Sequence, residues 1–194
     1  MRRILLLGAM AVLAAVQASP AALAARSGCT GIFECMNRES RSSAVPRQVV
    51  DFPDTRFTPG MVVIVAERHA LYYVLPGRKA IRYPIGVGRD GFQWKGFYRI
   101  ERKAEWPSWV PPAEMIAREA QKGIRLPAYM PGGPNNPLGA RALYIGGTLY
   151  RIHGTNAPHT IGGNVSSGCI RMLNRDVVDL YERVKVGARV FVYH

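Results

Sequence analysis

The sequence predicts a mostly β fold with one or two short helices. The prediction rests on many short runs of β-branched and aromatic residues at turn-sized spacing, and on only two segments with helical periodicity. Pro76-Gly77 and Gly146-Gly147 separate neighbouring runs as turns would. The predicted strands are residues 61–67, 71–75, 80–87, 97–102, 142–145, 149–153 and 189–193.

The two predicted helices are residues 113–122 and 174–184. The first begins after Pro112 and stops before Gly123, which are ordinary boundary signals for a helix. The second is short and amphipathic, with its apolar residues on one face. Between them, residues 126–139 are dense in Pro, Gly and Asn and form a loop of a length typical of functional or mobile segments.

The N-terminus predicts a signal peptide over residues 1–24. Arg2 and Arg3 precede an uncharged apolar run, and Ala22-Leu23-Ala24 has the small-residue pattern of a cleavage site. The apolar run is shorter than the roughly 20 residues of a membrane span, so we expect no stable span after cleavage. Residues 25–57 are expected to form an irregular N-terminal segment, followed by one folded domain over residues 58–194.

The chain is strongly basic, with a formal net charge of +13. Its Lys and Arg residues are scattered and form none of the blocks that mark a nucleic-acid-binding arm. Together with export, this argues against a nucleic-acid partner and favours an anionic partner in the cell envelope.

Cysteine counting singles out one thiol. Cys29 and Cys35 flank five residues near the expected mature N-terminus, where an oxidising compartment favours a disulfide between them. Cys169 is then left over, which indicates an intermolecular bridge or a reactive nucleophile. A bridge from Cys169 to one of the other two cysteines remains the alternative.

His153 and the residues around Cys169 suggest nucleophilic catalysis. A cysteine acts as its thiolate, and a histidine nearby can take the proton. His153 ends an apolar strand, and the glycines that follow let the chain fold back toward Cys169. No Asp or Glu occurs between Glu119 and Asp176, so the backbone carbonyl of Gly154 is the candidate that orients the histidine ring.

Two further groups complete a site for acyl transfer. A tight turn at Gly168 would present the backbone N–H groups of Gly168 and Cys169 as an oxyanion hole. Arg171 could pair with a carboxylate of the substrate. These residues suggest acyl transfer through a thioester, on a substrate that bears carboxylates.

The segments His153-Gly154-Thr155-Asn156, Ile161-Gly162 and Ser166-Ser167-Gly168-Cys169-Ile170-Arg171-Met172, with Asn174, resemble the signature of the bacterial L,D-transpeptidases of YkuD type. The resemblance covers residues 58–193 and implies an L,D-transpeptidase-like β-sandwich or barrel. One position departs from the pattern: many members carry histidine or lysine where this chain has Ser167.

The resemblance implies a reaction on peptidoglycan stem peptides in the periplasm, in cell-wall biogenesis and the control of cell shape. Cys169 would attack the diaminopimelate carbonyl of a tetrapeptide stem and release D-Ala, with His153 as general base and Gly154 as its partner. The implied substrate-binding residues are Arg171, Asn174, Ser167 and Thr155. The acceptor amine would belong to a second stem, a free D-amino acid or an outer-membrane protein, and no metal or organic cofactor is required.

Three alternatives stay open at this point. A zinc site from His153, His159 and Cys169 has no familiar ligand spacing, and metal ligation would quench the nucleophile. A cell-wall cysteine endopeptidase or carboxypeptidase would use the same thioester but transfer it to water. A non-catalytic module that binds the envelope would need Cys169 only for structure.

Overall fold

A computed structural model describes residues 46–90, 92 and 94–193 of the protein. The predicted signal peptide and the predicted Cys29–Cys35 disulfide lie outside these residues. Cys169 is the free cysteine of the described part of the chain, and it is partly exposed.

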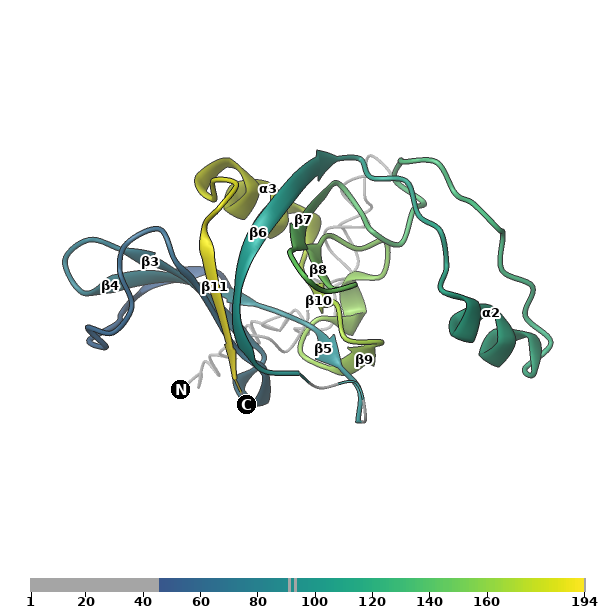
Figure 1. The fold of residues 1–194 in the computed structure, drawn as a ribbon, viewed down its shortest axis with the longest axis horizontal. Helices are drawn as coiled ribbons and strands as arrows, with labels where there is room; N and C mark the ends of the chain where they lie inside the picture. Colours follow the sequence, from purple (N-terminus) through teal and green to yellow (C-terminus); the bar gives the residue numbers. More distant parts are fainter. Residues whose placement is uncertain (1–45, 91, 93, 194) are drawn as a thin grey trace, which may run out of the picture. The chain divides into compact units, whose positions relative to one another are not determined.

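The fold is built on one curled nine-stranded sheet (Figure 1). Its strand order is β1-β4-β3-β2-β11-β6-β7-β8-β10. Strands β5 and β9 pair in parallel and form a separate two-stranded sheet. The strands are β1 (Gln48–Asp51), β2 (Val62–Val65), β3 (Ala70–Leu75), β4 (Lys79–Pro84), β5 (Val87–Gly88), β6 (Gly96–Glu105), β7 (Arg141–Ile145), β8 (Arg151–His153), β9 (Asn164–Ser166), β10 (Ile170–Arg171) and β11 (Arg189–Tyr193).

Strand β6 joins the two halves of the sheet. Its first part pairs with β11 and its second part with β7, and the register shifts between Ile100 and Arg102. A register shift of this kind bends a strand and increases its twist. Figure 1 shows β6 as a long arc, so that the sheet curls and brings β7, β8 and β10 round to face the other half.

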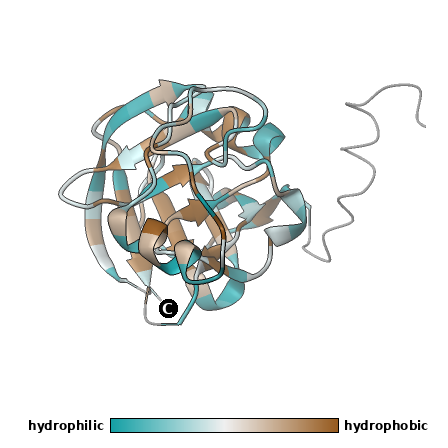
Figure 2. Cartoon of the chain, turned by 90° about the vertical axis from the view of Figure 1, so that its right-hand side faces the viewer, coloured by the Kyte–Doolittle hydropathy of each residue, from teal (hydrophilic) through white to brown (hydrophobic). Residues whose placement is uncertain are grey.

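The core lies inside this curl and is closed by the helix α3 (Asn174–Arg183). Val177 and Leu180 of α3 are fully buried, and the helix contacts β7 and β8. Figure 2 shows the apolar residues concentrated on the interior strands, with hydrophilic residues toward the outside. Other fully buried core members include Ile64, Leu71, Leu143, Ile152 and Met172.

A second helix, α2 (Ala113–Ala120), has no buried residue and lies on an extended arm away from the sheet (Figure 1). Mutual backbone hydrogen bonds of 2.8 Å between Trp109 and Met130 hold the two sides of this arm together. No helix within the described ranges is long and apolar enough to cross a membrane.

The predicted fold class, mostly β with one or two short helices, is confirmed. The structure differs from the prediction in its short elements. In the segment expected to be irregular, Gln48–Asp51 form strand β1 on β4, where Val49 and Val50 supply the β-branched residues. Strands β5, β9 and β10 have two or three residues each, which is too short for a periodic pattern.

Lys103 of β6 ties the sheet to the end of helix α3. Its Nζ donates to the carbonyl of Tyr181 at 2.5 Å and to that of Val184 at 2.8 Å. Carbonyls at a helix C-terminus lack partners within the helix, and a lysine satisfies them while its charge complements the helix dipole.

We therefore expect Lys103→Met to lower the free energy of unfolding by about 1–3 kcal/mol, because two carbonyls lose a charged donor. Chemical denaturation followed by circular dichroism measures this loss. Lys95→Met is the matched control, since Lys95 is exposed in the loop before β6. Equal effects of the two substitutions would show that Lys103 contributes nothing beyond an exposed lysine.

Candidate active site

The parallel pairing of β8 with β10 assembles the candidate site. Ile170 lies opposite Ile152 and Arg171 opposite His153, with the two isoleucines buried in the core. Since side chains alternate along a strand, His153 and Arg171 point to the other face. Arg151 lies two residues before His153 on the same face of β8, and Cys169 directly precedes β10, two residues before Arg171. The pairing thus places a thiol, an imidazole and two guanidinium groups together, including three residues that the sequence predicts.

His153 is buried and held in one orientation. Its Nδ1 lies 2.6 Å from the carbonyl oxygen of Gly154, the hydrogen bond expected from the sequence. Because a carbonyl can only accept, Nδ1 carries the proton and Nε2 keeps its lone pair. Burial and then the positive charge of Arg171 lower the pKa of His153 to about 3, against the opposing interactions with the backbone of Gly154 and of Leu138. The imidazole is therefore neutral at physiological pH.

The Cys169 thiol is also neutral at rest. Burial raises the pKa of Cys169 above its ordinary value, and the positive charge and backbone of Arg151 oppose this effect, followed by the charge of Arg171. Both arginines lie close enough to the sulfur to stabilise a thiolate. The Nε atoms of Arg151 and Arg171 are buried and have no hydrogen-bond partner among the described residues.

The turn before Cys169 is fixed by Ser166. The Ser166 hydroxyl donates to the carbonyl of Cys169 at 2.6 Å and accepts the N–H of Gly168 at 3.1 Å. The Gly168 N–H is therefore hydrogen-bonded to Ser166, and its role in the oxyanion hole stays a prediction. No partner for the Cys169 N–H is found in the described part of the chain, so it remains as the candidate donor.

Arg171 and Ser167 lie beside the nucleophile with partners of their own. Arg171 donates from Nη1 to Thr160 Oγ1 at 3.1 Å, and its backbone exchanges two hydrogen bonds of 2.8 Å with Gly86. Burial lowers the pKa of Arg171. Ser167 Oγ accepts from Nη2 of Arg89 at 3.4 Å. A positive charge thus lies next to Ser167, although serine itself carries none.

Asn174 and Thr155 hold the His153–Gly154 segment rather than opening on the site. Asn174 Oδ1 accepts the N–H of Ala140 at 3.0 Å and of Thr155 at 3.1 Å, and its Nδ2 donates to the Thr155 carbonyl at 2.9 Å. Thr155 is buried, and its hydroxyl accepts the N–H of Ala157. These hydrogen bonds position the His153–Gly154 segment, and the role of Asn174 and Thr155 in substrate binding stays a prediction.

Sequence reasoning missed Arg151, Trp94 and Ser166. Arg151 could have been found, because it lies two residues before His153 on a strand and so shares its face. Trp94 gives no such signal: its Nε1 donates to the Gly168 carbonyl at 2.6 Å from a loop 74 residues earlier in the chain. Ser166 is part of the predicted signature, but its hydrogen bonds depend on the turn.

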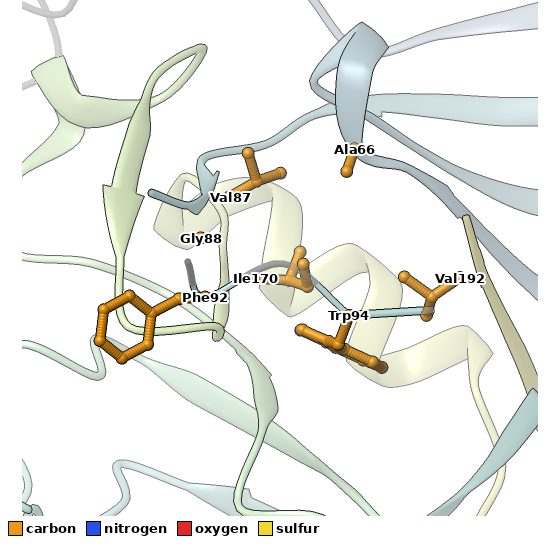
Figure 3. A pocket seen from close by; sticks show the side chains of 7 residues that line it. All are labelled: Ala66, Val87, Gly88, Phe92, Trp94, Ile170 and Val192. Atoms are coloured by element: carbon orange, nitrogen blue, oxygen red, sulfur yellow. The ribbon is translucent and has the colours of Figure 1, made fainter. Parts of the chain in front are cut away.

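A small apolar hollow lies behind the nucleophile turn (Figure 3). Its volume of about 10 Å³ is at the lower limit for one water molecule, so it is a packing gap rather than a substrate site. In Figure 3 the ring of Phe92 points away from the other labelled side chains. The lining residues are Ala66, Val87, Gly88, Phe92, Trp94, Ile170 and Val192.

A metal centre finds no support in this arrangement. Within the described ranges, no three His, Cys, Asp or Glu side chains gather as a metal would require. His159, the third ligand of the zinc alternative, is exposed on a short 3-10 helix (Pro158–Thr160).

Comparison with known proteins identifies the family. Residues 59–192 match the L,D-transpeptidase catalytic domain, YkuD. The "Probable L,D-transpeptidase YbiS" of Escherichia coli is 44% identical over 150 residues, which cover 75% of this chain and 47% of that protein. The chain belongs to the L,D-transpeptidase catalytic-domain family. It spans about half the length of the curated relatives it matches.

Solved structures share the fold. L,D-transpeptidase 3 from Mycobacterium tuberculosis has a TM-score of 0.53 at 18% identity, with 69% of this chain and 60% of that chain covered. A Brucella melitensis protein described as a "Probable carnitine operon oxidoreductase" has a TM-score of 0.52 at 43% identity, with 79% of this chain and 96% of that chain covered.

The oxidoreductase description has one possible counterpart in this chain, and its context does not fit. Residues 86–91 read GVGRDG, which has the glycine spacing of a dinucleotide-binding turn. That turn requires a following helix whose N-terminus binds the pyrophosphate. Here the segment leads from β5 to the strand β6. The glycine spacing therefore carries no nucleotide site.

The charges around Cys169 yield a test of its reactivity. The thiolate is the reactive form, and the thiol pKa is raised, so alkylation by iodoacetamide should rise steadily as the pH increases through the alkaline range. Arg151→Gln removes a charge that lowers this pKa, so alkylation at pH 8 should slow by about three- to tenfold.

Arg68→Gln is the matched control. Arg68 is exposed on a short 3-10 helix (Ala66–Arg68) that carries none of the candidate site residues. Mass spectrometry of samples quenched at successive times gives the alkylation rates of both variants. Equal rates for Arg151→Gln and the unaltered protein would show that Arg151 does not act on the sulfur.

Proposed function

We propose that the protein is a periplasmic L,D-transpeptidase that carries a peptidoglycan stem as a thioester on Cys169 and transfers it to an amine. The observation that supports this most is the shared face of β8 and β10, which holds the only free thiol of the described residues beside a buried, oriented imidazole. Family membership supports the same chemistry.

The reaction divides into two acyl transfers. Cys169 Sγ attacks the carbonyl of the third stem residue, diaminopimelate, and the bond to the D-Ala nitrogen breaks, so D-Ala leaves as a free amine. An amine of the acceptor then attacks the thioester and restores the thiol. His153 Nε2 takes the thiol proton in the first step and supplies a proton to the leaving amine.

The resting state of the pair determines when the proton moves. Both His153 and Cys169 are neutral before substrate binds, since burial disfavours either charge. Proton transfer therefore accompanies the attack instead of preceding it, and Arg151 and Arg171 stabilise the sulfur as it becomes negative. A neutral resting thiol also reacts more slowly with oxidants than a thiolate would, which suits an exported enzyme.

The cations at the site match the substrate class. A tetrapeptide stem carries carboxylates, and Arg151 and Arg171 place two positive charges close to Cys169. Arg89 adds a third guanidinium beside Ser167, where the charge of a histidine or lysine is missing. A charged hydrogen bond to a carboxylate is roughly twice as strong as a neutral one, so these residues favour an anionic donor.

Cys169→Ala should abolish turnover while leaving the domain folded. Purified protein is incubated with disaccharide-tetrapeptide, and the products are separated by chromatography. Release of D-Ala with formation of a cross-linked dimer is expected from the unaltered protein. For the variant we expect a loss of about a thousandfold or more, because no other group can form the acyl intermediate.

The thermal unfolding curve of the variant is the control for folding. D-Ala release without a dimer would mean that water is the acceptor and would assign a hydrolase. Turnover retained by Cys169→Ala would refute the role of the thiol altogether.

A further inference from the structure

Trp94 is held rigidly against the turn that carries the nucleophile. Its indole Nε1 donates to the carbonyl oxygen of Gly168 at 2.6 Å. The indole plane stacks on Tyr150, with ring centroids 4.7 Å apart and an interplanar angle of 19°, and Tyr98 meets it edge-on at 5.2 Å. Aromatic packing on two sides fixes the direction of this donor.

Gly168 is confined from the opposite side as well. Its φ of 103° lies in the region that favours glycine, and a Cβ there would approach Cε1 of Tyr150 to 2.2 Å. A Cβ on Gly88 would lie 3.2 Å from the Gly168 Cα. Figure 3 shows Gly88, Trp94 and Ile170 around the same hollow. Only glycine fits, and the backbone at 168 has one available position.

The hydrogen bond from Trp94 to the Gly168 carbonyl also fixes the direction of the Cys169 N–H, because both groups belong to one peptide bond. In a trans peptide the C=O and the N–H point in opposite directions within one plane. No cis peptide occurs in the described residues, so the Gly168 oxygen on Trp94 directs the Cys169 N–H to the other side. The Gly168 N–H is bonded to Ser166, whereas the Cys169 N–H is unpartnered.

From this we propose that Trp94 is a positioning residue that aims the Cys169 N–H at the oxyanion of the tetrahedral intermediate. The proposal deepens the acyl-transfer function and rests on it. Trp94 touches no reacting atom; it acts through the peptide between Gly168 and Cys169.

The test compares two reactions of the same sulfur. p-Nitrophenyl acetate acylates Cys169 through a tetrahedral oxyanion, with release of p-nitrophenolate, whereas iodoacetamide alkylates it by displacing iodide without an oxyanion. Trp94→Phe keeps an aromatic ring and removes the N–H. We expect acylation to slow by about 10- to 100-fold and alkylation to stay within about twofold.

Tyr98→Phe is the matched control, since it removes a hydroxyl that bonds to the Lys95 carbonyl from the same aromatic cluster. It should change neither rate. Equal losses in both reactions for Trp94→Phe would show that Trp94 merely shapes the turn, and unchanged rates would show that it has no role. Either result overturns the proposal. Neither depends on the natural stem peptide, so a failure of the proposed function shows separately, as absent D-Ala release.

A second inference concerns a basic groove on a different part of the surface, at the junction of β6, β11 and the end of α3. The groove encloses about 460 Å³. Four cationic side chains line it and no Asp or Glu does so. The four cations are Arg99, Arg183, Lys185 and Arg189.

The cations of this groove are poorly neutralised. Arg99 and Arg189 are exposed and lie directly opposite each other on β6 and β11. Arg99 donates to the Gly187 carbonyl and Arg189 to the Thr58 hydroxyl, both neutral acceptors. Lys185 forms no ion pair within the described ranges, and Arg183 alone has a carboxylate partner, Asp179. Like charges directly opposite on neighbouring strands are destabilising.

This arrangement fits a bound anion better than an empty surface. We infer that the groove binds carboxylates of the peptidoglycan polymer outside the catalytic site, which would keep the enzyme on the polymer between reactions. The inference rests on the proposed function, because the catalytic site would take stems from the same polymer.

Sedimentation with insoluble peptidoglycan sacculi tests the groove. Arg99→Gln with Arg189→Gln should weaken binding by about tenfold and reduce its dependence on salt, because two exposed charges are lost. Turnover of a soluble tetrapeptide should stay within about twofold of the unaltered protein. Arg68→Gln with Arg78→Gln, two exposed arginines outside the groove, is the control of equal charge.

Equal weakening by both double variants would assign the binding to net charge and overturn the inference. So would binding to anionic phosphatidylglycerol vesicles in place of sacculi. Because sedimentation does not require catalysis, a protein that binds sacculi through the groove but releases no D-Ala would refute the proposed function and leave the groove intact.

Discussion

The site depends on one interaction, the parallel pairing of β10 with β8. These two short strands are held in register by the burial of Ile152 and Ile170 in the core. That register fixes which residues share the outer face. A shift of β10 by one residue would turn Arg171 and Cys169 toward the core and leave His153 without them, since side chains alternate along a strand. Packing on one face of the pair thus sets the chemistry on the other.

The electrostatics follow from the same placement. Burial keeps His153 and Cys169 neutral, and the two arginines that flank them on the strands favour negative charge on the sulfur over positive charge on the imidazole. The site therefore stabilises negative charge, either on a bound substrate carboxylate or on the sulfur as it attacks. Ser166, Trp94 and Tyr150 then fix the turn so that one backbone N–H stays available beside the sulfur.

The sequence predicts the parts of this site better than their roles. Alternation and turn signals locate the long strands and both helices, and cysteine counting isolates Cys169. The contact between His153 and the Gly154 carbonyl follows from the absence of a nearby acidic residue. The hydrogen bonds of Gly168, Asn174 and Thr155 could not be predicted, because their partners depend on how the turn and the neighbouring loops fold. Trp94 acts across 74 residues, and no local pattern reports such a contact.

The central claim is that Cys169 carries the stem as a thioester. Intact-protein mass spectrometry after rapid mixing with a disaccharide-tetrapeptide, in the absence of an acceptor amine, tests it most directly. We expect a mass increase equal to the donor minus D-Ala, mapped to the peptide that contains Cys169 and removed by hydroxylamine. An unmodified protein that nevertheless releases D-Ala, or an adduct on another residue, would contradict it.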